Sequence, residues 1–425
     1  MTADVQSLDS SAESLRPIKP NPGSELDPAN FVGRDDVTAR AQTMLEARQN
    51  ILLGDPRRMG KSFWIATFAH RMNSSGALRV IMIDYQGVDT VEEFLRLTVE
   101  HLSRSQRVPR RFLDYASALF DNIPLDAEVA LGPVTLKKAV RDSEASAAQL
   151  LENILIRLDD ETAADIKDSK KDRDKAGPLV IAMDEVSDAL LSIAARDPRA
   201  ADNLLRRLRH LRHQATHIRW IVAGSVGFHH VLARCGAGED VLNDLNTLPF
   251  GPLDAADSTL LTRRLALGIR RDIAQDAVDA MFAVTDGMPY LIQKLADTMR
   301  YDDRNQPATS PITASEVAAR FDAFLNDRDL SRDVTQFVSR IDRYYGDHVR
   351  TAFAILDHVA AGPASTCLLA EVPESLRSQS DFALTLRNLI DDHYLTLTST
   401  PDGDRLTWRY PALRTIYVHR RSTRG

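Results

Sequence analysis

The chain of 425 residues has only two cysteines, Cys235 and Cys367. Two cysteines cannot build a disulfide framework, and no C-x-x-C pair is present to hold zinc. Both are therefore expected to be ordinary thiols in a reducing cytoplasm. Aromatic residues are also scarce, at 6%, so we expect cores built mainly from Leu, Ile, Val and Ala.

Long apolar runs and an excess of basic residues are absent as well. No segment approaches the ~18 apolar residues that span a membrane, and residues 1–30 lack the apolar core of a signal peptide. We therefore expect a cytoplasmic protein. The net charge is −7 and the pI about 5.9, so any contact with nucleic acid must come from a local patch. The hydrophobic fraction of 44% and charged fraction of 27% are typical of soluble globular proteins.

Residues 30–252 carry short apolar runs separated by helical stretches. The runs are 50–53, 80–83, 179–183 and 220–223. Continuous apolar strands between helices predict an α/β domain with a parallel sheet covered on both faces. Residues 1–29, rich in Ser, Pro and acids, are expected to form a flexible arm. We predict a β-hairpin insertion at about 120–142 and a solvated or disordered loop at the charged stretch 160–177.

The pattern becomes helical in residues 253–330 and changes again in 331–425. Helices are predicted near 349–360, 365–371 and 380–391. A hairpin then follows, with its strands at 394–398 and 406–410 on either side of a Pro-Asp-Gly turn. Three helices followed by a hairpin indicate a winged helix-turn-helix.

The segment from Gly54 to Ser62 reads Gly-Asp-Pro-Arg-Arg-Met-Gly-Lys-Ser and lies between a predicted strand and a predicted helix, as a P-loop requires. Gly60 lets the backbone approach a phosphate, Lys61 supplies a positive charge, and Ser62 offers a hydroxyl to Mg²⁺. Five residues instead of four separate the two glycines, which puts Asp55 at the position of the first glycine. A carboxylate near the phosphates is expected to weaken nucleotide binding by repulsion.

An acidic pair, Asp184 and Glu185, closes the third apolar run. An Asp at the end of a strand can hold the Mg²⁺ shell, and a Glu beside it can polarise the attacking water. Such pairs are common in isolation, but this one follows a correctly placed Gly-Lys-Ser. The last apolar run ends at Ser225, where a polar side chain can respond to the γ-phosphate. The sequence thus predicts an ATPase that uses ATP/ADP and Mg²⁺. Its predicted catalytic residues are Glu185, Lys61 and Ser225, and its predicted metal ligands are Ser62 and Asp184.

These motifs resemble those of the archaeal-type ATPase family, in the STAND branch of P-loop ATPases that neighbours the AAA+ origin-recognition proteins. The resemblance covers about residues 30–425. It rests on Phe31-Val32-Gly33-Arg34, the loop 56–62, Asp184-Glu185, the run 220–227 and Gly287-Met288-Pro289. It implies a sheet in which one strand separates the Asp184 strand from the P-loop strand, then a helical lid over 253–330 and a winged helix packed on the lid. It also implies a slow ATPase used as a switch, often with a partner effector or in assemblies.

The resemblance also implies a set of nucleotide-binding residues. Phe31, Val32 and Arg34 would flank the adenine, and Pro289 would touch it from the other side. The full expected set is Phe31, Val32, Arg34, Pro56, Arg57, Arg58, Met59, Gly60, Lys61, Ser62, Phe63 and Pro289.

The protein's partner is less constrained by the sequence. Four arginines on the predicted helix at 200–214 are interpreted as a solvated face, with a subunit contact, an arginine acting in trans or a nucleic-acid patch as alternatives. His229-His230 has no carboxylate or cysteine at ligand spacing, so no metal is assigned to it. The predicted recognition helix, 380–392, has three aspartates and one arginine, which disfavours binding to phosphates. We expect a switch acting on a protein partner or assembly; the alternative is a DNA-associated ATPase, such as a regulator, transposition or defence factor, that binds DNA through its winged helix.

Overall fold

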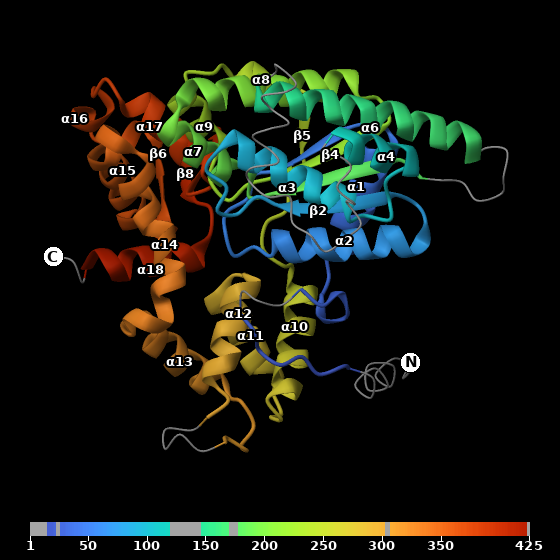
Figure 1. Cartoon of the computed structure of the whole chain (residues 1–425). Coiled ribbons are helices and arrows are strands. Elements are labelled where there is room, and N and C mark those ends of the chain that lie inside the picture. Colours follow the sequence, from blue (N-terminus) through green and yellow to red (C-terminus); the bar gives the residue numbers. More distant parts are fainter. Residues whose placement is uncertain (1–14, 23–25, 120–145, 170–176, 302–306, 423–425) are drawn as a thin grey trace. The chain divides into compact units, whose positions relative to one another are not determined.

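The computed structural model describes residues 15–22, 26–119, 146–169, 177–301 and 307–422 (Figure 1). The chain divides into two compact units. The sheet unit comprises Asp35–Arg57 and Lys61–Phe250, and the helical unit comprises Met1–Arg34, Arg58–Gly60 and Gly251–Gly425. Three residues in the middle of the Gly-Lys-Ser loop therefore belong to the helical unit.

Five parallel strands form the sheet, in the order β2-β3-β4-β1-β5. They are β1 (Asn50–Leu53), β2 (Arg79–Asp84), β3 (Leu179–Asp184), β4 (Ile218–Ala223) and β5 (Leu245–Thr247). Every residue of β3 and β4 is buried, which explains their nearly continuous apolar sequences. Strand β4 lies between β1 and β3, which confirms the order expected from the family resemblance. The edge strand β5 was not predicted, because its three residues include two that are exposed and polar.

Helices cover both faces of this sheet, as predicted. One core of buried side chains joins β2, β3 and β4 to α3, α4, α6, α7, α8 and α9. The described buried residues of α1 and α2 are not part of that core, and Figure 1 shows α2 across the sheet from α6 and α8. The helices are α1 (Asp35–Glu46), α2 (Lys61–Ser75), α3 (Val91–Ser103), α4 (Arg110–Leu119), α6 (Ala147–Ser169), α7 (Val186–Arg196), α8 (Pro198–Gln214) and α9 (Phe228–Cys235).

Helix α6 corrects the prediction of a charged loop at 160–177. The helix continues to Ser169, and Glu161 and Thr162 on it are 7% and 0% exposed. Its acidic residues were interpreted as solvated because distant partners are not visible in the local sequence; Asp165, for example, pairs with Arg79 at the start of β2. Residues 170–176 lie outside the described residues, and so does the hairpin predicted at 120–142.

The helical unit confirms the helical pattern predicted between about 254 and 328. Its first helices, α10, α11 and α12, pack against one another (Figure 1). They are α10 (Ala255–Gly268), α11 (Gln275–Thr285) and α12 (Pro289–Thr298), followed by α13 (Ala314–Asn326). No helix in the described parts of either unit is long and apolar enough to cross a membrane.

A short part of the N-terminal segment packs on the helical unit. Ile18 is 3% exposed, and its N–H donates to the carbonyl oxygen of Arg264 on α10 at 2.9 Å. The Arg264 guanidinium in turn donates to the carbonyl oxygen of Arg16 at 2.8 Å. The expectation of a flexible arm therefore does not hold for this part, since backbone hydrogen bonds and two buried side chains, Ile18 and Pro20, leave no periodic signal in a sequence.

The C-terminal part contains a three-stranded antiparallel sheet in the order β6-β8-β7. The predicted hairpin is confirmed, with β7 (Leu395–Thr400) paired to β8 (Gly403–Trp408). The helix predicted at 365–371 is wrong, because Thr366–Leu368 form β6, which pairs with β8, and a 3₁₀ helix follows at Leu369–Glu371. The helices are α14 (Arg328–Tyr344), α15 (Val349–Ala361), α16 (Glu374–Arg377), α17 (Phe382–Asp391) and α18 (Pro411–Ser422). Assigning these elements to a winged helix remains a prediction.

Asp159 on α6 generates the first testable prediction. Its carboxylate accepts from the N–H groups of Thr216, His217 and Ile218 at 3.1, 2.7 and 2.8 Å, just where β4 begins. Asp159→Ala leaves these donors without that acceptor, so we expect the free energy of unfolding to fall by about 2–3 kcal/mol. Asp160→Ala, at the exposed neighbouring position, is the control and is expected to change it by less than about 0.5 kcal/mol. Urea denaturation measures both, and equal effects would refute the capping role.

Candidate functional site

The loop from Gly54 joins β1 to α2, and Lys61 and Ser62 open that helix. A helix N-terminus that follows such a loop presents backbone N–H groups and the positive end of the helix dipole to an anion. Lys61 is 6% exposed, and its ammonium group donates to the carbonyl oxygens of Asp55 and Pro56, the latter at 2.8 Å. The positive charge is thereby held inside the loop, as a phosphate site requires.

Asp55 has a buried partner, which favours a structural role over the repulsion of phosphates expected from the sequence. The residue is 3% exposed, and its Oδ2 accepts a hydrogen bond from the Phe250 N–H at 3.2 Å. The Phe250 ring packs edge-on against Trp64 of α2, with ring centroids 5.7 Å apart. The carboxylate therefore fastens the start of the loop to the segment that follows β5, whereas the sequence analysis directed it toward the phosphates.

Asp184 and Ser62 meet at the carboxyl edge of the sheet, where the Ser62 hydroxyl hydrogen-bonds to the Asp184 carboxylate. Burial raises the pKa of Asp184, and the carboxylate of Asp84 at the end of β2 raises it further, against the opposing effects of Ser62 and Lys61. Carboxylate and hydroxyl oxygens are the hard ligands that Mg²⁺ prefers, and a divalent cation would offset the repulsion between the two carboxylates. The residues at this position therefore fit a magnesium site.

Glu185 has a φ of 55° at the N-cap of α7, in the left-handed region. A residue other than glycine adopts this conformation at a cost of about 1–3 kcal/mol, and such strain concentrates at functional sites. Burial raises the pKa of Glu185 to about 7, and the neighbouring Asp188 carboxylate contributes. The Oε2 atom of Glu185 accepts from the Ser225 hydroxyl at 2.7 Å.

Ser225, which follows β4, is the centre of a polar cluster. Its Oγ lies 2.6 Å from Asp188 Oδ2 and accepts from Arg57 Nε at 2.8 Å. Arg57 Nη2 lies 3.1 Å from Asp188 Oδ2 and 4.0 Å from Glu185 Oε2. The sequence analysis missed Asp188, although its position in the first turn of α7, three residues after Glu185, was an available signal.

In the helical unit, Arg34 binds backbone atoms of the same Gly-Lys-Ser loop. The residue is 4% exposed, and its guanidinium donates to the carbonyl oxygens of Met59 at 2.9 Å and Gly251 at 2.8 Å. Its N–H donates to Asp257 Oδ2, and a side chain at Gly33, where φ is 73°, would collide with that carboxylate. Arg34 thus braces the loop backbone, and its expected role beside the adenine stays a prediction.

The start of α12 lies against other residues of the loop. The Arg58 guanidinium lies 4.4 Å above the ring of Tyr290, and a Cβ on Gly60 would lie 3.7 Å from Pro289 Cγ. Gly287 has a φ of 68°, and a Cβ there would lie 2.1 Å from a backbone oxygen, so the Gly-Met-Pro turn before α12 requires glycine.

The remaining expected binding residues are divided between the units. Phe31, half-buried, ends the 3₁₀ helix Pro28–Asn30, and Val32 is buried in the helical unit. In the sheet unit, Pro56 is buried and Phe63 is half-buried in the first turn of α2. Their roles toward a nucleotide stay predictions.

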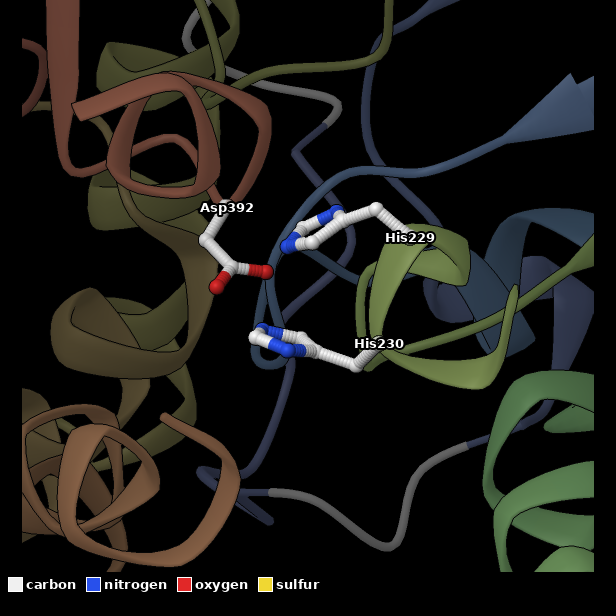
Figure 2. Close-up of side chains that lie close together, drawn as sticks. All are labelled: His229, His230 and Asp392. Atoms are coloured by element: carbon white, nitrogen blue, oxygen red, sulfur yellow. The ribbon is translucent and has the colours of Figure 1, made fainter. Parts of the chain in front are cut away.

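His229 and His230 stand side by side on α9, with ring centroids 4.1 Å apart (Figure 2). Asp392, which Figure 2 also labels, belongs to the helical unit, whereas the two histidines belong to the sheet unit. No metal centre is assigned to the pair.

A parallel sheet ordered β2-β3-β4-β1-β5, a glycine-containing loop between β1 and α2, and an acidic pair after β3 define the P-loop NTPase fold. No protein-family model and no curated protein sequence matches the chain. Among solved structures, it is similar to a Walker-type ATPase of Pyrococcus abyssi, with a TM-score of 0.57 and 17% identity over 95% of this chain and 98% of the other. This similarity is one of fold, and it confirms the fold class predicted from the sequence.

Two other solved structures match over most of their length with lower scores. The ORC2 protein of Aeropyrum pernix has a TM-score of 0.47 and 10% identity over 96% of this chain and 97% of the other. The RuvB Holliday junction branch migration motor of Thermotoga maritima has a TM-score of 0.39 and 12% identity over 90% and 95%. Scores this low support no argument about function.

Asp55 generates the second prediction. Asp55→Ala removes the acceptor of a buried N–H, so we expect the free energy of unfolding to fall by about 1–3 kcal/mol. Asp55→Asn keeps an acceptor oxygen and is expected to lose less stability. Neither variant is expected to bind a fluorescent ATP analogue more tightly than the unmodified protein. Tighter binding by Asp55→Ala at unchanged stability would show that the carboxylate acts on the phosphates instead.

Proposed function

We propose that this chain is an ATPase that binds ATP with Mg²⁺ in the 54–62 loop and hydrolyses it slowly. The observation that carries the proposal is the Ser62–Asp184 pair, which lies beside the buried Lys61 and is followed directly by the strained Glu185. All four belong to the sheet unit. The fold shared with a Walker-type ATPase of Pyrococcus abyssi supports the same conclusion.

Ser62 and Asp184 would hold the Mg²⁺ ion. When bound, the ion neutralises phosphate charge and polarises phosphoryl oxygens. Lys61 offers its charge to the β- and γ-phosphates. Arg58 is part of the loop and Pro289 lies next to Gly60, which supports roles for both residues toward the nucleotide.

Glu185 is the proposed general base. It takes a proton from water as the water oxygen bonds to the γ-phosphorus, while the bond from that phosphorus to the β–γ bridging oxygen breaks. The products are ADP and phosphate, and Glu185 then returns its proton to solvent. Ser225 orients the carboxylate through its 2.7 Å hydrogen bond. A base restrained by the Ser225 hydrogen bond is consistent with the slow turnover that we propose.

We propose that the partner is a protein. It would bind through residues 253–330, proposed to form a lid, and residues 331–425, proposed to form a winged helix. On α8, the four arginines pair with Asp202, Glu152, Asp240 and Asp244, so their charge is compensated within the sheet unit. On α17, Arg387 lies 3.7 Å from Asp391, and Leu384 is 51% exposed. Compensated arginines contribute little to phosphate binding, which favours a protein partner over DNA.

A cytoplasmic location is part of the same proposal. Both cysteines are free thiols, and burial raises the pKa of Cys235 to about 11, which keeps it protonated. Burial also raises the pKa of Cys367. Two cysteines that form no disulfide fit a reducing compartment.

The third prediction separates the roles of Lys61 and Glu185. Lys61→Ala leaves phosphate charge uncompensated in a partly desolvated site, so we expect ATP binding to weaken by about 2–5 kcal/mol. Lys167→Ala, at an exposed position on α6, is the matched control and is expected to bind normally. Glu185→Gln is expected to keep its ATP affinity while turnover falls at least about tenfold, because orientation of water matters only in the chemical step.

A fluorescent ATP analogue and a phosphate-release assay measure both effects. Unimpaired turnover in Glu185→Gln would remove Glu185 as the base. Normal binding by Lys61→Ala would remove the P-loop interpretation.

The fourth prediction concerns the partner. We expect the size of the protein in solution to depend on whether ATP, ADP or no nucleotide is present, and we expect no shift of duplex DNA at near-physiological salt. Light scattering and gel-shift titrations measure these outcomes. A DNA shift that weakens steeply as salt increases would favour the alternative, a DNA-associated ATPase.

A further inference from the structure

The Ser225 hydroxyl faces two carboxylates at once. Its Oγ lies 2.6 Å from Asp188 Oδ2 and 2.7 Å from Glu185 Oε2. A hydroxyl has one proton to donate, so it can satisfy only one of these acceptors at a time. The carboxyl groups of Glu185 and Asp188 also hydrogen-bond to each other, and Arg57 brings a positive charge to this cluster.

Arg57 is closer to Asp188 than to Glu185. Its Nη2 lies 3.1 Å from Asp188 Oδ2 but 4.0 Å from Glu185 Oε2. Its Nε donates to Ser225 at 2.8 Å, so the guanidinium is fixed at two points. Asp188 thus holds a positive charge that would otherwise lie next to the proposed base.

The three side chains come from different parts of the sheet unit. Arg57 lies in the loop after β1, Ser225 follows β4, and Asp188 lies in the first turn of α7. Helix α7 fixes the position of Asp188 relative to Glu185, which is the N-cap residue of that helix. The geometry therefore allows Asp188 to set the distance between the loop arginine and the base.

We propose that Asp188 is a positioning residue that holds Arg57 and the Ser225 hydroxyl, and so prevents Arg57 from forming a direct ion pair with Glu185. The inference rests on the proposed ATPase function. A carboxylate paired directly with a guanidinium has its oxygens occupied by the N–H donors and is less available to a water molecule. Asp188 thus acts on the chemical step without touching the nucleotide.

The experiment uses the full-length protein and steady-state phosphate release with Mg²⁺ and ATP. Asp188→Asn is nearly isosteric and removes the charge that holds Arg57. We expect kcat to fall at least about fivefold and KM to change less than about twofold, because the lost interaction affects only the chemical step. Asp202→Asn on α8, which removes a carboxylate paired with Arg206, is the matched control and is expected to leave both constants unchanged.

A second substitution distinguishes positioning from a merely structural effect. Arg57→Gln in the Asp188→Asn background removes the group expected to capture Glu185, so kcat at saturating ATP should recover relative to Asp188→Asn alone. Asp188→Glu keeps the charge and is expected to turn over faster than Asp188→Asn. If Asp188→Asn folds poorly, Asp188→Glu replaces it as the background for Arg57→Gln. In that background, Arg57→Gln is expected to cause no further decrease in kcat.

Several results would overturn the inference. An unchanged kcat in Asp188→Asn would show that the carboxylate does not position the base. A further loss of kcat in the double variant would show that Arg57 does not capture Glu185. Failure of the proposed function looks different, because the unmodified protein itself would then release no more phosphate than Lys61→Ala; the inference would fail with it.

Discussion

Parallel pairing of β4 between β1 and β3 is the constraint on which the site in the sheet unit depends. The register places Leu53 beside Ala223 and Met183 beside Val222, so the three strands end at the same edge. The residues that follow them therefore emerge close together, although they are far apart in the sequence. This pairing brings Ser225 to Glu185 at 2.7 Å, and Asp184, the last residue of β3, to Ser62 at the start of α2.

Local patterns were sufficient to predict much of this arrangement. The apolar runs predicted β1 to β4, because strands buried on both faces need continuous apolar sequence. The Gly-Lys-Ser loop and the Asp184-Glu185 pair could also be predicted, because the residues of each motif are adjacent in the sequence. The edge strand β5 and the short strand β6 were missed, because both depend on hydrogen bonds to strands distant in the sequence.

Three carboxylates show where the sequence was insufficient. Asp159 accepts from the backbone at the start of β4, Asp55 accepts from Phe250, and Asp188 binds Arg57 and Ser225. Each carboxylate has its role from partners that lie dozens of residues away in the sequence. Asp55 was therefore expected only to repel phosphates, and the roles of Asp159 and Asp188 were not predicted, because a local pattern does not show a distant hydrogen-bond donor.

Under the proposed function, the two cations at this site would respond differently to a bound nucleotide. Lys61 is held by carbonyl oxygens of its own loop, and Arg57 is held by Asp188 and Ser225. Phosphate oxygens entering the loop would compete with the carbonyl oxygens for Lys61, because a charged acceptor binds an ammonium group more strongly than a carbonyl does. Asp188 is itself a charged acceptor, so it would keep Arg57 away from Glu185, the N-cap residue of α7. The exchange of partners at Lys61 is therefore the change that we expect from nucleotide binding, and it leaves the neighbours of the proposed base in place.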